Sequence, residues 1–145
     1  MSVSDPPIQR ILAPNPSALT GPGTNTYIIG ATDLAVIDPG PDLDDHLAAI
    51  LAATGGRPVS RIVVTHAHRD HSALARRLAT ATGAEVLAYG AASAGRSPRM
   101  ADWADRLPPV AEGLDPDFAP DRRLADGDRI TGPDWELSVL HTPGH

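Results

Sequence analysis

Short apolar runs separated by polar turns fill the chain from residue 9 to residue 88. Runs of this kind, bounded by Gly, Pro, Asn or Asp, are typical of short buried strands. They predict strands at residues 9–13, 26–29, 34–37, 61–65 and 85–88. The short polar link between the second and third of these strands favours a hairpin.

Two segments between the expected strands repeat their apolar residues at helical spacing. The first stripe comprises Leu43, Leu47, Ile50 and Leu51, and the second comprises Leu74, Leu78 and Ala81. Gly55-Gly56 and Gly83 follow the two stripes and end the predicted helices, and Asp42 or Asp44 could cap the first one. Strands that alternate with helices predict an α/β layer with right-handed crossovers.

Residues 91–121 lose this regularity and are rich in Gly, Pro, Ser and Asp. Within them, Met100, Trp103 and Leu107 stand at helical spacing and predict one short helix with apolar anchors. We interpret the segment either as an insertion or lid-like element near a site, or as a plain surface loop. Beyond it, the alternation of residues 135–140 predicts a final strand with one buried face.

The composition is that of one globular domain covering residues 1–145. Hydrophobic residues make up 41% of the chain, and cysteine is absent, which excludes disulfides and thiolate ligands. The chain has no run of about 18 apolar residues and no secretory leader, so we expect a cytoplasmic protein without a membrane span. A net charge of -6 favours a small-molecule substrate over nucleic acid, although a local basic patch is not excluded.

The strongest candidate chemistry lies in the loop Thr65–His71, between an expected strand and an expected helix. His66 and His68 are two residues apart, so in extended backbone they project to the same side. Asp70 and His71 follow where the chain turns into the helix. Imidazole nitrogens and a carboxylate suit zinc and its borderline neighbours. The alternative is a polar turn whose histidines face water, but a ligand at every expected position favours a metal site.

Outside this loop, one carboxylate is especially informative. Asp38 ends the apolar strand 34–37, and a carboxylate there is costly to bury unless it is hydrogen-bonded. One interpretation is that Asp38 accepts a hydrogen bond from a ligand imidazole or from the metal loop. The other is a turn residue before Pro39-Gly40. Of the remaining histidines, His46 is expected to face solvent and His141 to be structural.

Three motifs carry a resemblance to a known family. They are the sequence H-x-H-x-D-H after a strand, the segment Val36-Ile37-Asp38-Pro39-Gly40 and the final residues His141-Thr142-Pro143-Gly144-His145. Together they resemble the motifs of the metallo-β-lactamase superfamily. Further segments are similar to its branch containing β-lactamase-like protein 2, near glyoxalase II: Asn15-Pro16-Ser17, Gly23–Gly30 and Leu124–Asp128. The resemblance implies an αββα sandwich, of which this chain would cover the N-terminal half.

The resemblance also implies a set of metal ligands. His66, His68 and His145 would hold a first metal, while Asp70 and His71 would begin a second site. Asp70 would orient the attacking water and could accept its proton. A complete domain of the family binds two Zn²⁺ ions, and this chain would retain one. The Asp and His that complete the second site follow later in family members, together with the second half of the sandwich.

These features favour a zinc-dependent hydrolase acting on an ester, thioester or phosphodiester. The alternatives are an endoribonuclease-type member of the same fold and a truncated metal-binding domain without catalysis. A flavin-associated di-iron oxygen reductase is disfavoured, because that group usually has Glu where His68 stands. With half of the sandwich missing, we expect an exposed apolar patch, and hence a dimer or a complementary C-terminal half as partner.

Overall fold

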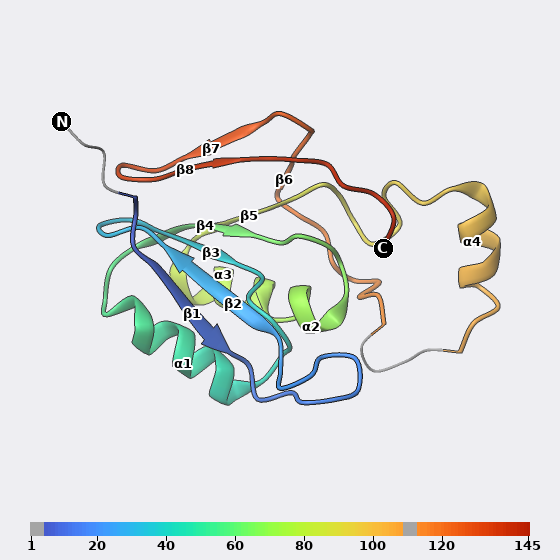
Figure 1. The fold of residues 1–145 in the computed structure, drawn as a ribbon, viewed down its shortest axis with the longest axis horizontal. Coiled ribbons are helices and arrows are strands. Elements are labelled where there is room, and N and C mark those ends of the chain that lie inside the picture. Colours follow the sequence, from blue (N-terminus) through green and yellow to red (C-terminus); the bar gives the residue numbers. More distant parts are fainter. Residues whose placement is uncertain (1–4, 109–112) are drawn as a thin grey trace.

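The computed structural model describes residues 5–108 and 113–145, and a six-stranded sheet forms its centre (Figure 1). In spatial order its strands are β1 (Ile8–Leu12), β2 (Asn25–Ile29), β3 (Leu34–Ile37), β4 (Val59–Val63), β5 (Glu85–Ala88) and β6 (Arg122–Arg123). The first three strands pair antiparallel, and β3 to β6 pair parallel. The expected α/β layer is confirmed, and the bounds of β3 and β5 agree with the sequence prediction.

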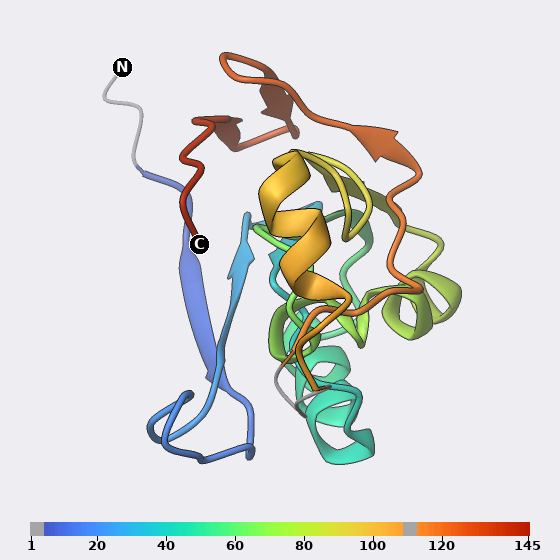
Figure 2. The same ribbon diagram turned by 90° about the vertical axis from the view of Figure 1, so that its right-hand side faces the viewer.

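Helices cover one face of this sheet and a small hairpin covers part of the other (Figures 1 and 2). These elements are α1 (Asp44–Thr54), α2 (Arg69–Ser72), α3 (Ala75–Thr82), and the hairpin strands β7 (Arg129–Thr131) and β8 (Glu136–Ser138), while a further helix, α4 (Pro98–Ala104), lies apart from the sheet (Figure 1). Neighbouring strand residues point to opposite faces, so Val36 packs in the helix-side cluster and Ala35 in the hairpin-side cluster. Within the described residues, no helix is long and apolar enough to cross a membrane.

Helix α1 turns inward a face that matches the expected stripe in part, since Ile50 is buried and Leu47 packs against the core. Its buried residues are His46, Ile50 and Thr54, spaced four residues apart, whereas Leu51 is exposed. The expectation that His46 faces solvent is therefore wrong, since the residue is only 1% exposed. Thr26 supplies a hydrogen-bond partner at 2.8 Å from His46 Nε2, which makes burial of a polar ring tolerable.

The start of α1 also differs from the prediction. Leu43 occupies the N-cap position, and no side chain caps the helix, so the expected cap by Asp42 or Asp44 is wrong. Both carboxylates instead form ion pairs with Arg77 on α3. The two carboxylates thus interact with the Arg77 guanidinium and not with the backbone of α1. Exposed ion pairs of this kind stabilise a fold only weakly.

The chain between β4 and β5 is divided more finely than the sequence predicts. β4 ends at Val63, two residues earlier than expected, and the expected helix is split into α2 and α3. On α3, Ala75, Leu78 and Ala79 are buried. Ala81, which was expected on this inner face, is exposed, because the helix presents Ala75 and Ala79 to the sheet beside Leu78.

Residues 91–121 contain the expected short helix, α4, which begins after a Ser97 cap. The apolar side chains expected as anchors are exposed, however: Met100 and Trp103 on α4 by 55% and 48%, and Leu107, beyond the end of α4, by 62%. Figure 1 shows the reason, since α4 projects away from the sheet and reaches no layer of the core. A role of the segment as an insertion or lid stays a prediction, and part of it lies outside the described residues.

The face of the sheet opposite the helices has its own apolar cluster. It consists of Ile29, Ala35, Leu87, Leu124, Ile130 and Trp135. The Trp135 ring is packed so closely that a Cβ added at Gly132 would come within 2.2 Å of it, and its Nε1 donates to Asp33 O at 2.7 Å. The hairpin thus covers part of the face that we expected to be bare, and the expected apolar patch stays a prediction.

Candidate metal centre

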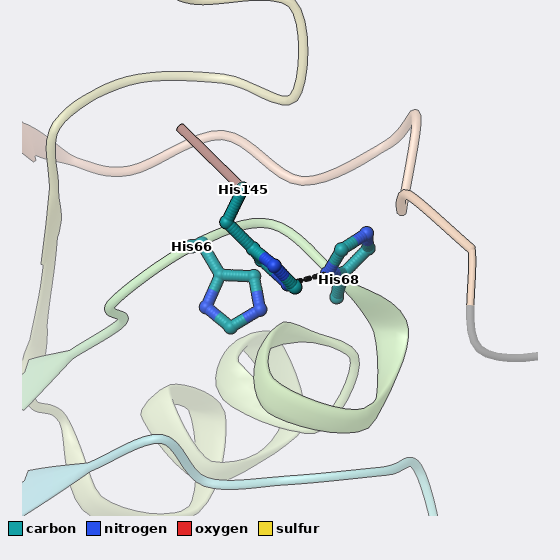
Figure 3. Close-up of side chains that lie close together, drawn as sticks. All are labelled: His66, His68 and His145. Atoms are coloured by element: carbon teal, nitrogen blue, oxygen red, sulfur yellow. Dashed lines mark hydrogen bonds between the residues drawn. The ribbon is translucent and has the colours of Figure 1, made fainter. Parts of the chain in front are cut away.

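The candidate site lies at the carboxyl ends of the parallel strands β3 and β4, where α/β folds usually bind ligands. Asp38 directly follows β3, and the loop after β4 carries His66 and His68 into α2. The last residues of the chain return to the same edge after β8. They bring His145 beside the histidine loop (Figure 3).

Three histidine side chains converge at this edge. One nitrogen atom from each of His66, His68 and His145 lies within 4.8 Å of the others. His145 Nε2 is 3.0 Å from His68 Nδ1, and the His66 ring stands edge-on to both, with centroids 4.8 and 4.9 Å away (Figure 3). Three imidazole nitrogens in this arrangement match the donor set of a zinc ion with three protein ligands.

The surroundings keep two of these imidazoles neutral. Burial, followed by the neighbouring His71 and His68, lowers the pKa of His66 to about 4. Burial and then the nearby His145 also lower the pKa of His68. A neutral imidazole has a lone pair available for a metal, so both side chains are in the ligating form at neutral pH.

Thr65 determines which nitrogen of His66 is available. The Thr65 hydroxyl donates to Asp38 Oδ2 at 2.8 Å and lies 2.9 Å from His66 Nδ1. Because the single hydroxyl proton goes to Asp38, the contact with His66 requires Nδ1–H to donate to Thr65. This assignment leaves His66 Nε2 free to bind a metal.

Asp38 is 6% exposed and accepts hydrogen bonds from two parts of the histidine loop. The backbone N–H and the hydroxyl of Thr65 both donate to it at 2.8 Å, and His71 Nδ1 lies 2.8 Å from its Oδ2. The N–H of Gly40, which an Asx turn would direct to the Asp38 carboxylate, donates to His71 O instead. The carboxylate is therefore engaged with the histidine loop and not with its own turn.

Asp70 and His71 lie directly beside the three-histidine cluster. The rings of His71 and His66 are 4.2 Å apart, and His71 Nε2 is 3.2 Å from Asp70 Oδ2. The Thr24 hydroxyl donates to the same oxygen at 3.0 Å. Burial alone lowers the pKa of His71, but the hydrogen bond and charge of Asp38, with the charge of Asp70, outweigh it and leave that pKa raised.

Comparison with known proteins assigns this arrangement to a family. The sequence profile of the Metallo-beta-lactamase superfamily matches residues 19–145. The chain belongs to this superfamily. The expected metallo-beta-lactamase fold is thereby confirmed. The expected likeness to β-lactamase-like protein 2 and glyoxalase II is also confirmed, because two similar proteins have these functions in their names.

The Beta-lactamase-like protein 2 homolog of Drosophila melanogaster is 30% identical over 94% of this chain and 44% of that protein. The Hydroxyacylglutathione hydrolase of Pseudomonas fluorescens is 34% identical over 77% of this chain and 34% of that protein. The structure of BJP-1, a subclass B3 metallo-beta-lactamase of Bradyrhizobium japonicum, superimposes with a TM-score of 0.61 at 26% identity, covering 85% of this chain and 48% of that one. The chain therefore spans less than half the length of each relative.

The metallo-beta-lactamase superfamily implies a metal cofactor, and the donor atoms of this chain fit one. Three imidazole nitrogens face one another, and the Thr65 contact leaves Nε2 of His66 free. Nitrogen donors at this spacing suit zinc among the common metals of proteins. Asp70 and His71 stand next to these donors but lie outside the group of three.

Sequence reasoning missed the hydroxyl groups that support this metallo-beta-lactamase site. Thr24, Thr26 and Thr65 each bind a site carboxylate or its backbone from 12 to 46 residues away. Thr26 and Thr65 stand in apolar runs, where threonine is an ordinary strand residue, and Thr24 follows a Gly-Pro-Gly turn, so no local pattern marked the three hydroxyls. His141, assigned no ligand role, stacks on Tyr89 with ring centroids 4.4 Å apart, away from the cluster.

Proposed function

We propose that this chain holds the first metal of a zinc-dependent hydrolase whose substrate is a small-molecule thioester. The convergence of three histidine nitrogens within 4.8 Å, with Asp70 alongside, carries the proposal. Support for hydrolysis comes from the relatives, which include a hydroxyacylglutathione hydrolase. An acylated glutathione is a thioester, which favours this substrate class over an oxygen ester or a phosphodiester.

His66, His68 and His145 would hold the metal. Zinc, when bound, lowers the pKa of its water to about 7 and polarises the carbonyl of the substrate. Thr65 and Asp38 keep His66 in the tautomer that offers Nε2. Ordering of this kind raises both the basicity of a ligand and the precision of its orientation.

Asp70 would position the attacking water and accept its proton. Its Oδ2 is fixed between the Thr24 hydroxyl at 3.0 Å and His71 Nε2 at 3.2 Å. A carboxylate held in this way can act as a general base within hydrogen-bond reach of the nucleophile. Asp70 and His71 would also begin a second zinc site, which should be weak because these two are the ligands we assign to it among the described residues.

A second candidate is a metal-binding domain without catalysis of its own. It is favoured by the donor set, since the clustered group within the described residues consists of His66, His68 and His145, and Asp70 and His71 lie outside it. An RNA-cleaving function has less support, because a net charge of -6 gives no general attraction to a phosphate backbone.

Zinc content and thioester hydrolysis of purified variants test the proposal. His68→Ala should remove most of the bound zinc, because two histidine ligands hold a zinc ion much less tightly than three. His141→Ala is the matched control, since His141 is an exposed histidine that stacks on Tyr89 outside the cluster. Asp70→Asn should retain the first zinc and lower hydrolysis by about 10²–10⁴-fold, the usual effect of losing a general base.

The two candidate functions give different results. Zinc binding with no hydrolysis of acylglutathione or acyl-thioester probes by the parent chain would support the non-catalytic domain. Equal zinc content in His68→Ala and His141→Ala would overturn both candidates.

A further inference from the structure

One buried histidine lies outside the three-histidine cluster. His46 is the third residue of α1 and is 1% exposed. Its Nε2 lies 2.8 Å from the hydroxyl of Thr26 on β2, and a Cβ added at Gly40 would lie 2.9 Å from the same nitrogen. The ring is thus enclosed between the helix and the turn that follows β3.

The direction of the hydrogen bond between His46 and Thr26 follows from the other contact of Thr26. The Thr26 hydroxyl donates to the backbone carbonyl of Asp38 at 2.6 Å. A hydroxyl has one proton, so Thr26 can only accept from His46, and His46 must carry its proton on Nε2. The contacts form a directed chain from His46 through Thr26 to the Asp38 carbonyl.

The end of this chain is a strained point of the backbone. Asp38 is the single non-glycine residue among the described ones with positive φ, at 50°. Such a conformation persists only where the surroundings hold it. The Asp38 N–H donates to Val63 O at 2.9 Å, and Thr26 holds its carbonyl. With both backbone groups held, the carboxylate points at Thr65 and His71.

Packing alone does not explain an imidazole at position 46. Its Nδ1 has no hydrogen-bond partner among the described residues, and an unpaired buried polar atom is unfavourable. An apolar side chain of similar volume would fill the space without that penalty. Burial lowers the pKa of His46, against a smaller raising effect of the Pro39 backbone, which is consistent with a neutral ring that donates from Nε2.

We propose that His46 is a positioning residue for the metal centre, acting through Thr26 to hold the Asp38 backbone so that its carboxylate orders His66 and His71. The role deepens the proposed function and rests on it. Among the described residues, the side-chain hydrogen bond of His46 goes to Thr26 and not to a candidate ligand, so its effect passes through two hydrogen bonds and one strained residue.

Three variants test this role. His46→Leu removes the donor, His46→Gln keeps an N–H donor near the position of Nε2, and Thr26→Val removes the middle link with little change of volume. One readout is zinc affinity by competition with a chelating dye. The other is the downfield proton resonance of the His71 Nδ1–H group bound to Asp38, recorded on metal-free protein.

His46→Leu and Thr26→Val should each weaken zinc binding by about 10-fold, the lower end of the range for residues that orient ligands. Both should shift or broaden the His71 resonance. His46→Gln should stay within about twofold of the parent, because it restores the donor. If His46→Leu does not fold, Thr26→Val and His46→Gln decide the question.

Ile50→Ala is the matched control, since Ile50 is buried on the same face of α1 one turn further on. It should lower the unfolding midpoint and leave zinc affinity and the His71 resonance unchanged. Parental affinity and an unchanged resonance in both His46→Leu and Thr26→Val would overturn the role of His46. The resonance separates this failure from that of the proposed function, because it is observed without metal.

Discussion

At the scale of single residues, the Asp38 carboxylate connects two imidazoles of the candidate site. It accepts a hydrogen bond from His71 directly, and it orders His66 through the Thr65 hydroxyl. Both imidazoles are thereby restricted to one tautomer. Loss of the carboxylate would leave each ring free to present the wrong nitrogen.

Asp38→Ala should therefore weaken zinc binding by about 10–100-fold. Isothermal titration of zinc into the metal-free chain measures the change. Asp126→Ala is a suitable control, since Asp126 accepts an exposed backbone hydrogen bond from His141 and does not contact the cluster. If Asp38→Ala binds zinc as tightly as the parent chain, Asp38 does not order the ligands and serves as a turn residue.

The histidines also predict how the metal-free chain responds to mild acid. The folded state lowers the pKa values of His46, His66 and His68 below 6.5, with His66 near 4. Below pH 6.5 the unfolded chain then binds more protons at these positions, so stability falls as the pH drops toward 4. His71 has a raised pKa and acts in the opposite sense, since its contribution is full below 6.5 and is lost at higher pH.

Because the pKa of His66 is lowered furthest, to about 4, we expect a net loss of stability in acid. Urea unfolding of the metal-free chain at about pH 7.5 and about pH 5 measures it. The midpoint should be lower at the acid pH. An equal or higher midpoint at pH 5 would contradict the assignment of His66 as a neutral, low-pKa imidazole.

At the scale of elements, the sequence predicted strands better than helix faces. β3 is an uninterrupted apolar run, and β5 is apolar after Glu85, because both faces of these strands are buried, so their bounds could be read directly. On α1, the apolar stripe indicated a face from which the structure buries Ile50, and it adds His46 and Thr54, which the pattern did not indicate. The hydrogen-bond partner that permits this burial, Thr26, lies 20 residues away and leaves no local signal.

The same division applies to the candidate site. The histidine loop was recognisable because its ligands are adjacent in sequence, and its position after a parallel strand fixed the edge of the sheet where it lies. Among the supporting groups, Asp38, which binds His71 from 33 residues away, could be proposed from its place at the end of a strand as one of two interpretations. Thr24, which binds Asp70 from 46 residues away, could not. Only the tertiary structure brings such partners together.

The hairpin β7–β8 should depend on one side chain. Trp135 is buried against Gly30 and Gly132 and donates to Asp33 O. Trp135→Ala should lower the free energy of unfolding by about 3–5 kcal/mol, as is usual for a buried aromatic residue. Urea denaturation followed by circular dichroism measures the loss.

The other tryptophan of the chain provides the control. Trp103 lies on the projecting helix α4 and is largely exposed. Trp103→Ala should change the free energy of unfolding by no more than about 0.5 kcal/mol. Equal losses in the two variants would show that the hairpin does not pack through Trp135.

At the scale of the whole molecule, the two faces of the sheet are covered unequally. Within the described residues, helices and a large apolar cluster cover one face, while two short hairpin strands and a smaller cluster cover part of the other (Figure 1). Several large apolar side chains remain exposed, among them Ile8, Leu12, Leu19, Tyr89, Met100, Trp103, Leu107 and Leu140. An exposed apolar area of more than a few hundred Å² usually marks an interaction surface.

We therefore predict that the purified chain self-associates or binds a complementary partner and that it holds one tightly bound zinc. Light scattering combined with metal analysis tests both parts of this prediction. Association should weaken at low protein concentration, and the zinc ratio should stay near one per chain. A monodisperse monomer with two tightly bound zinc ions would contradict the prediction.

His68 and His145 are 77 positions apart in the sequence, yet their side chains meet at the candidate site. An ion shared by these two side chains closes the intervening polypeptide into a loop and so removes conformational entropy from the unfolded chain. The ion would then act as a cross-link across the second half of the chain, from α2 through β8. Zinc should slow amide hydrogen exchange in the β7–β8 hairpin, although none of the three histidines belongs to it.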